Sequence, residues 1–303
     1  MIFKVTILGS NSAIPTVKRN PTAQLVNHNE RLFLVDCAEG TQVQLRKIKI
    51  RIQRVSNIFI SHLHGDHFFG LIGLISSMHL LGRNKPLNIY GPAQLEDILK
   101  IQLDASETKL NYELIFHPLN MEDELVIYED EKLTISTIPM NHSIPTVGFM
   151  FREKLGKRRL IRGKIAELNI PVQNILPIKN GADFIDENGV LHKNSEVTEN
   201  PLVPRTYAFC SDTSYYEPTI PIVAGADLLY HETTFMHDMA KAAADKLHST
   251  TIEAGTIAKK ANVKKLIIGH FSMRYDILNH LLDETKTVFS NTELAKDGKV
   301  FEL

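Results

Sequence analysis

The stretch His62-Leu63-His64-Gly65-Asp66-His67 follows an apolar, strand-like run and precedes an apolar, helix-like run that begins at Phe68. Its first two histidines are two positions apart, so on an extended chain their side chains point the same way. The glycine permits the tight turn that brings the aspartate and the third histidine beside them. Imidazole and carboxylate are ligands that zinc accepts where thiolate is absent. We therefore expect a metal site at this strand-to-helix corner, rather than a histidine-rich surface loop.

Three more potential ligands each follow a run that we predict to be a strand: His142 follows Leu133–Ile138, Asp212 follows Thr206–Cys210, and His270 follows Lys265–Ile268. In layered α/β folds, binding sites gather beyond the carboxyl ends of strands. With the first motif, these residues supply what a two-metal site needs, including a carboxylate that is able to bridge. We therefore expect them to complete a dinuclear centre.

The remaining sequence predicts an α/β layered fold, because short β-rich runs alternate with amphipathic stretches and no repeat occurs. Further strands are expected at Lys4–Leu8, Arg31–Val35, Asn57–Ile60, Leu87–Tyr90 and Asp227–Tyr230. Helices are expected at Thr41–Ile48, Phe68–Leu81, Gln94–Gln102, Ser249–Lys260 and Tyr275–Thr287. We expect one domain over residues 1–303 with one inserted arm.

Composition limits the partners and the compartment. The net charge of −1 gives no attraction of the whole chain to nucleic acid or membrane, so such a partner needs a local patch. Cys37 and Cys210 are the only cysteines, which favours a reducing compartment. The N-terminus lacks the pattern of a signal peptide, and the longest apolar run, Phe68 to Leu81, is too short to span a bilayer. We predict a cytoplasmic protein without a membrane partner.

A local basic patch does occur, between Arg152 and Lys164, where seven basic residues stand against one acid. A stretch rich in proline and glycine continues from it to residue 204, and we predict that residues 152–204 form an inserted arm. If nucleic acid is a partner, Lys157, Arg158 and Arg159 are the candidate contacts to its phosphates. The alternative is a solvated basic loop.

The His-x-His-x-Asp-His run resembles the signature of the metallo-β-lactamase superfamily, and within it the chain is most similar to the ribonuclease Z family of tRNA 3′-processing endonucleases. The resemblance extends along the chain through Leu8-Gly9-Ser10, Pro15, Arg19-Asn20, the run from Val35 to Gln42, Asn141-His142, Ser211-Asp212-Thr213, His231-Glu232-Thr233-Thr234, His248-Ser249-Thr250, Gly269-His270-Phe271-Ser272 and Arg274-Tyr275. It implies a four-layer αβ/βα sandwich with the arm inserted, a homodimer, and precursor tRNA as the substrate.

The resemblance also implies two Zn²⁺ ions per subunit, a site that Mn²⁺ or iron can fill as well. The first ion is assigned to His62, His64, His142 and Asp212, and the second to Asp66, His67, Asp212 and His270. Two stretches depart from the family pattern. The first loop, Gly9 to Ala13, is poorer in glycine, and Ile170-Pro171 is not followed by Gly-Pro, so contacts to RNA are expected to differ there.

Roles in catalysis follow from the same resemblance. Asp66 is expected to orient and deprotonate the attacking water, and His248, positioned by Glu232, is expected to protonate the leaving oxygen. The products are a tRNA with a 3′-hydroxyl and a trailer with a 5′-phosphate. The alternative for His248 is that Ser249 caps the following helix and the histidine merely lies beside it.

Ser272 and Arg274, just after the last candidate ligand, are candidate phosphate contacts. The alternative is that Ser272 makes a loop hydrogen bond and Arg274 is a surface charge.

Three other functions stay open. The first is another hydrolase of the superfamily, such as an arylsulfatase, a cyclic-nucleotide phosphodiesterase or a thioester hydrolase, for which a basic arm has no use. The second is a non-catalytic RNA-binding protein, which would be expected to have lost ligands. The third is an iron redox enzyme, for which no flavodoxin-like extension is present.

Overall fold

Two seven-stranded sheets form the framework of the structure, a computed structural model that describes residues 2–303. The first has the order β18 (Val300–Glu302), β1 (Phe3–Gly9), β2 (Ala23–His28), β3 (Arg31–Val35), β4 (Val55–Phe59), β5 (Leu87–Gly91) and β6 (Leu114–Pro118). The second has the order β17 (Thr292–Leu294), β16 (Leu266–Gly269), β15 (Leu228–Glu232), β14 (Thr206–Cys210), β9 (Thr146–Glu153), β8 (Leu133–Met140) and β7 (Val126–Glu129).

Each sheet contains a run of parallel strands: β3 to β6 in the first and β14 to β17 in the second. Parallel strands need crossover connections, which here carry helices. The first sheet has α1 (Thr41–Lys47), α2 (Gly65–Phe68), α3 (Leu71–Leu80), α4 (Gln94–Ala105) and the 3-10 helix η1 (Ile52–Arg54). The second has α8 (Thr219–Ile222), η2 (His237–Met239), α9 (Ala240–Asp245), α10 (Thr251–Lys260) and α11 (Asn279–Lys286).

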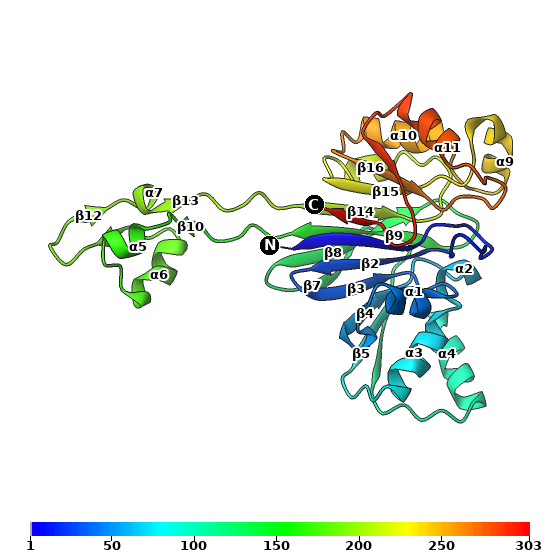
Figure 1. The fold of residues 1–303 in the computed structure, drawn as a ribbon, viewed down its shortest axis with the longest axis horizontal. Coiled ribbons are helices and arrows are strands. Elements are labelled where there is room, and N and C mark those ends of the chain that lie inside the picture. Colours follow the sequence, from blue (N-terminus) through cyan, green and yellow to red (C-terminus); the bar gives the residue numbers. More distant parts are fainter. Residues whose placement is uncertain (1) are drawn as a thin grey trace. The chain divides into compact units, whose positions relative to one another are not determined.

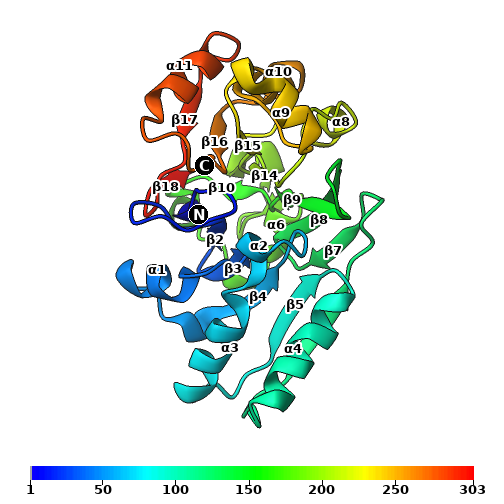
Figure 2. The same cartoon turned by 90° about the vertical axis from the view of Figure 1, so that its right-hand side faces the viewer.

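These helices lie on the outer faces of the two sheets, with α3 and α4 beside β4 and β5 and with α10 and α11 on the opposite side (Figures 1 and 2). The arrangement confirms the predicted four-layer αβ/βα sandwich. Within residues 2–303, no helix combines the length and the apolar character that crossing a bilayer requires.

Aromatic side chains fill the space between the sheets. Phe33 and Phe59 of the first sheet contact Phe151 and Phe149 of the second, with ring centroids 6.0 Å and 5.4 Å apart. All four rings are fully buried. Burial of each such side chain stabilises a fold by roughly 1.5–3 kcal/mol, so these contacts hold the sheets face to face. The carboxyl ends of the parallel strands are thereby fixed along one edge.

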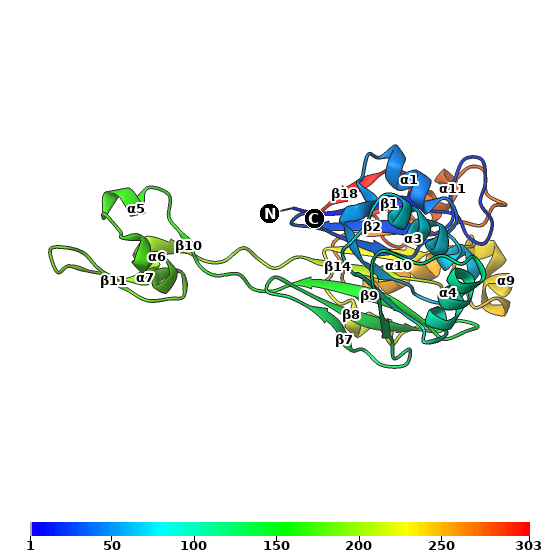
Figure 3. The same ribbon diagram turned by 90° about the horizontal axis from the view of Figure 1, so that it is seen from below.

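The chain divides into two compact units. The sandwich comprises residues 2–128, Ile135–Phe151 and Thr206–Leu303. The second unit comprises Arg152–Arg205 and, in addition to the segment predicted as an arm, Glu129–Thr134. It contains α5 (Lys164–Glu167), α6 (Val172–Lys179), α7 (Asn194–Val197) and two short strand pairs, β10 (Arg159–Leu160) with β13 (Thr198–Glu199) and β11 (Phe184–Ile185) with β12 (Leu191–His192). Figure 3 shows α6 and α7 beside β10. The unit has a small apolar core of its own, formed by Ile170, Ile178, Phe184 and Val197.

All eight predicted strands are present, with ends that shift by at most two residues. Strands β2, β6, β7, β9, β17 and β18 were not predicted. The single helix predicted over Phe68–Leu81 is wrong in one respect, because the structure has two separate helices there, α2 and α3. Between them, the Gly70 N–H group donates to the Cys37 carbonyl at 2.9 Å instead of to a carbonyl of α2, and a Cβ atom at Gly70 would lie 1.9 Å from the Ala38 carbonyl oxygen. The helix predicted from Tyr275 begins only at Asn279.

Candidate metal centre

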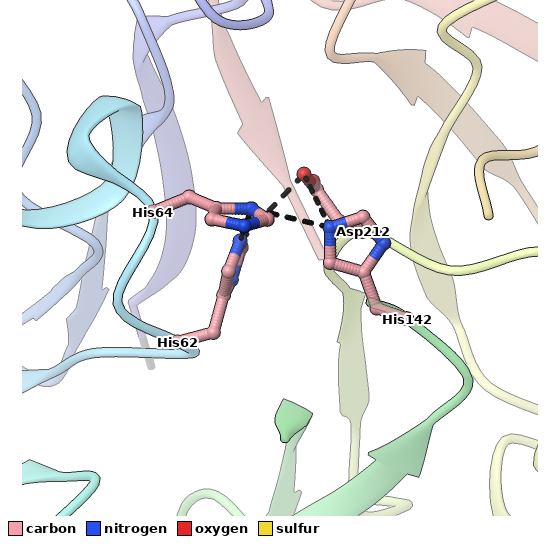
Figure 4. Close-up of side chains that lie close together, drawn as sticks. All are labelled: His62, His64, His142 and Asp212. Atoms are coloured by element: carbon pink, nitrogen blue, oxygen red, sulfur yellow. Dashed lines mark hydrogen bonds and ion pairs between the residues drawn. The ribbon is translucent and has the colours of Figure 1, made fainter. Parts of the chain in front are cut away.

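Side chains from both sheets converge where the parallel strands end. His62 and His64 follow β4, His142 follows β8, and Asp212 follows β14, and Figure 4 shows the four pointing toward one another. The Nδ1 atom of His64 lies 3.2 Å from the Nε2 atoms of both His62 and His142. Asp212 Oδ2 lies 3.7 Å from His62 Nε2 and 3.8 Å from His142 Nε2. These four residues form the first ligand group.

A second ligand group contains Asp66 and His67 of α2 and His270, which follows β16. Asp66 Oδ2 lies 3.6 Å from His67 Nε2 and 3.4 Å from His270 Nε2. The other oxygen of Asp212, Oδ1, lies 3.4 Å from His67 Nε2 and 3.2 Å from His270 Nε2. Asp212 therefore turns one oxygen toward each group. All seven residues that the sequence nominated as ligands meet at one place.

The Nδ1 atom of four histidines forms a hydrogen bond with a neighbouring residue, so that the Nε2 atom of each faces the centre. The pairs are His62 Nδ1 with Ser61 Oγ (3.0 Å), His67 Nδ1 with Asp36 Oδ2 (2.7 Å), His142 Nδ1 with the Leu247 carbonyl (2.9 Å) and His270 Nδ1 with Thr234 Oγ1 (2.9 Å). Hydrogen bonds of this kind fix the tautomer and the ring orientation of metal-binding histidines.

Two buried atoms indicate that the residues fit a metal. His67 Nε2 and Asp212 Oδ1 are buried and make no hydrogen bond, although they lie 3.4 Å apart. A buried polar atom without a partner destabilises a fold by about 1–3 kcal/mol, so native structures rarely leave one. A divalent cation between the groups would satisfy both atoms. The nitrogen and carboxylate donors suit zinc and similar transition metals.

The charge balance of the centre also favours a bound cation. Burial raises the pKa of Asp212, but His270 and His67 outweigh burial and hold the pKa well below its usual range. Burial lowers the pKa of His67, but Asp212, Asp66 and Asp36 outweigh it and raise the pKa well above its usual range. The carboxylates of Asp212, Asp66 and Asp36 thus favour a positive charge at this place, which a bound cation would supply.

His248 lies beside the ligands and is held by Glu232, the last residue of β15. The His248 Nδ1–H group donates to Glu232 Oε1 at 2.8 Å, and the buried carboxylate also accepts from the main-chain N–H groups of Thr213, Thr234 and Ser249. Burial lowers the pKa of His248, but Glu232 outweighs it, and the pKa rises to about 9. A protonated imidazole at neutral pH is able to donate a proton.

The predicted alternative for His248, a capping Ser249, is wrong. Thr250 is the N-cap of α10, and it forms a capping box with Glu253. The Ser249 hydroxyl instead donates to the Thr213 carbonyl at 2.7 Å. The helix cap therefore does not explain the position of His248.

A cavity of about 480 Å³ opens over the ligands. Its walls include Ala13, Ile14 and Pro15 of the first loop, Phe69, and His248. The Ala13 N–H group donates to Asp66 Oδ2 at 2.6 Å, which ties the first loop to the second ligand group.

The proposed substrate contacts lie outside that cavity lining. Arg274 Nε donates to Ser272 Oγ at 3.2 Å, and its guanidinium lies 5.1 Å from the centroid of the Phe235 ring. In the second unit, Lys157 is exposed, whereas Arg158 and Arg159 have partners within that unit. Arg158 donates to Thr198 Oγ1 and Asn200 Oδ1, and Arg159 pairs with Glu199 at 2.8 Å.

Sequence analysis missed Asp36 and Thr234 as residues that position ligands. Asp36 directly follows β3 and accepts from Ser61 N, Ser61 Oγ and His67 Nδ1. It also adopts a left-handed backbone, with φ +55°, which few side chains tolerate. An acid directly after the predicted strand Arg31–Val35 was the available signal, since the ligands also follow strands.

Known proteins resemble the chain over different lengths. A family model described as "Anti-Pycsar protein Apyc1" matches residues 3–160, which include the first histidine motif and His142 but end before Asp212. Ribonuclease Z of Bacteroides fragilis is 42% identical over 301 residues, covering 99% of both chains. Among solved structures, the human short-form tRNase Z is 27% identical with a TM-score of 0.72, covering 98% of each chain. The metallo-β-lactamase fold protein YhfI of Bacillus subtilis, 22% identical with a TM-score of 0.71 and covering all of both chains, shares the fold.

Proposed function

The chain belongs to the ribonuclease Z family, and from that premise we propose that it is a metal-dependent endoribonuclease that removes the 3′ trailer from precursor tRNA. The observation that carries the proposal is Asp212, whose two oxygens each face one ligand group while Oδ1 and His67 Nε2 lack hydrogen-bond partners. A carboxylate placed in this way suits two metal ions that act together on one phosphodiester.

We propose that both ions are Zn²⁺, which supplies Lewis acidity and acidifies water when bound. His62, His64, His142 and Asp212 would hold one ion, and Asp66, His67, Asp212 and His270 the other. Mn²⁺ or iron would fit the same donors at some cost in affinity.

The other roles belong to the side chains around the ligands. Asp66, fixed by the Ala13 N–H group, would orient the attacking water. The bond between phosphorus and the tRNA 3′-oxygen breaks, and the phosphate stays on the trailer. His248, held by Glu232, would donate the proton that the leaving 3′-oxygen needs.

Recognition of the tRNA would involve the basic segment of the second unit. Lys157 and Arg162 are exposed there, and their side chains have no partner among residues 2–303. Cationic side chains of this kind contact phosphates without reading sequence. Arg158 and Arg159 hold the segment in shape while remaining partly accessible. Ser272 and Arg274, which follow His270 in the sequence, remain candidate contacts. A homodimer and a cytoplasmic location also remain predictions.

The test is cleavage of a 3′-labelled precursor tRNA by the purified protein, with and without a chelator, with the cut mapped to a single nucleotide. We expect cleavage at the trailer junction that the chelator abolishes and added Zn²⁺ restores. His248→Ala should lose activity, whereas His280→Ala, an exposed residue of α11, should not. A metal-loaded protein that spares the precursor but hydrolyses an aryl sulfate or a cyclic nucleotide would overturn the proposal.

A further inference from the structure

A second cavity, of about 630 Å³, lies at the other end of β4 from the metal centre. Arg54, in its lining, directly precedes β4, whereas His62 follows that strand. Strands rise about 3.3 Å per residue, so the two places are separated by roughly 25 Å. The lining comes from the end of α1, from η1 and from the loop after α3. We call it the basic cavity.

Exposed cations line the basic cavity, and no Asp or Glu belongs to its lining. Arg46, Arg51 and Lys85 are exposed, and their side chains make no ion pair or hydrogen bond within residues 2–303. Only Arg54 is paired, with Glu30 at 2.8 Å. The sequence contains no Asp or Glu in residues 40–65 or 67–95, which together carry seven Lys and Arg. A chain with a net charge of −1 thus concentrates positive charge here.

One residue of the cavity lining, Arg83, is a buried cation. Arg83 is only 3% exposed, and it has no carboxylate partner among the described residues. Its guanidinium instead donates to the main-chain carbonyls of Lys85 (2.8 Å), Pro86 (2.6 Å), Gln53 (3.2 Å) and Val55 (2.9 Å). Carbonyl oxygens satisfy the donors but do not cancel the charge. Arg83 therefore fixes the shape of the wall and adds a permanent positive charge to it.

We propose that the basic cavity, which lies within the sandwich and apart from the metal centre, binds the phosphate backbone of RNA. Guanidinium groups bind phosphate oxygens in a bidentate manner. Ile50 and Leu81, also in the lining, offer apolar surface to a ribose or a base. An acidic protein segment would meet the same cations, but the proposed function makes RNA the ligand of this chain, and in that respect the inference rests on it.

The test compares two triple variants with the same change in charge. Arg46→Gln, Arg51→Gln and Lys85→Gln together neutralise the basic cavity. Lys241→Gln, Lys259→Gln and Lys286→Gln neutralise three exposed lysines on α9, α10 and α11. Binding of fluorescent mature tRNA, which has no trailer to lose, is followed by anisotropy between about 50 and 200 mM salt. Equal melting temperatures establish that both variants are folded.

We expect the cavity variant to bind tRNA about tenfold or more weakly at low salt, and the slope of log K against log salt to fall by up to about 3. The control should match the wild type. Equal binding by the two variants would overturn the inference. So would loss of binding to a polyglutamate peptide with tRNA binding unchanged. The proposed function fails on different evidence, namely a wild type that does not cut precursor tRNA.

Discussion

The replacement Asp36→Asn tests how the metal centre is held, because it removes one charge and no volume. Asp36 accepts three hydrogen bonds, from Ser61 N, Ser61 Oγ and the Nδ1–H group of His67. Asparagine offers a single acceptor oxygen. If its oxygen faces the Ser61 amide, its NH₂ group faces His67 Nδ1. The imidazole must then carry its proton on Nε2, the atom that faces the metal, and a protonated Nε2 cannot ligate.

The expected magnitude comes from two independent routes. A buried donor left without a partner costs about 1–3 kcal/mol. Substitution of a residue that orients a metal ligand typically weakens metal binding by about 10–100-fold. At about 1.4 kcal/mol per factor of ten, this range corresponds to about 1.4–2.8 kcal/mol, in agreement with the first route. Asparagine tolerates the left-handed backbone at position 36, so little strain is added.

The assay is titration of the metal-free protein with Zn²⁺ against a competing chelator, which gives one dissociation constant for each ion. We expect the site that contains His67 to weaken by about 10–100-fold and the site of His62, His64 and His142 to change much less. Asp283→Asn, on the exposed face of α11, is the matched control. Two unchanged constants in the Asp36 variant would refute the reasoning.

Three other outcomes follow from contacts described above. His248→Ala should retain both metals, measured by elemental analysis, and lower single-turnover cleavage of precursor tRNA by about 10²–10⁴-fold; loss of metal would instead make His248 a ligand. Lys157→Gln with Arg162→Gln should raise KM for precursor tRNA, and an equal loss on bis(p-nitrophenyl) phosphate would argue against RNA contact. Hydrogen bonds from two lysines lower the pKa of Glu293 to about 2. Its contribution to stability is full above about pH 4.5 and is lost as pH falls toward 2, so the melting temperatures of wild type and Glu293→Gln should converge there, by a small amount because the pair is largely exposed.

Sequence was sufficient to predict which candidate ligands converge, because they share one rule of position. Each follows a strand whose apolar residues are contiguous and easily seen, as with Thr206–Cys210 before Asp212. The parallel order of the strands then brings the ends together. The fold class was also predictable, because stretches with the periodicity of strands and of helices alternate in both halves of the chain.

Residues that act through another residue were harder to predict. The role of Asp36 depends on a left-handed backbone and on a hydrogen bond to a residue 31 positions away, neither of which leaves a periodic signal. The interruption between α2 and α3 depends on a hydrogen bond from the Gly70 N–H group to the Cys37 carbonyl, which is distant in sequence. The basic run Arg46–Arg54 was overlooked beside the denser segment at Arg152–Lys164, because only the fold brings the loop with the buried Arg83 against it to form a cavity.

The distribution of the ligands along the chain has a consequence for biosynthesis. The first candidate ligand, His62, and the last, His270, are separated by 208 positions. At about 5–20 residues per second, a ribosome needs roughly 10–40 s to pass from one to the other. The nascent chain therefore exposes a cluster of histidines long before the carboxylate and the imidazole that complete both groups exist. Under the proposed assignment, both groups are complete only after His270 has been synthesised, and a chain released before His270 carries an incomplete second group.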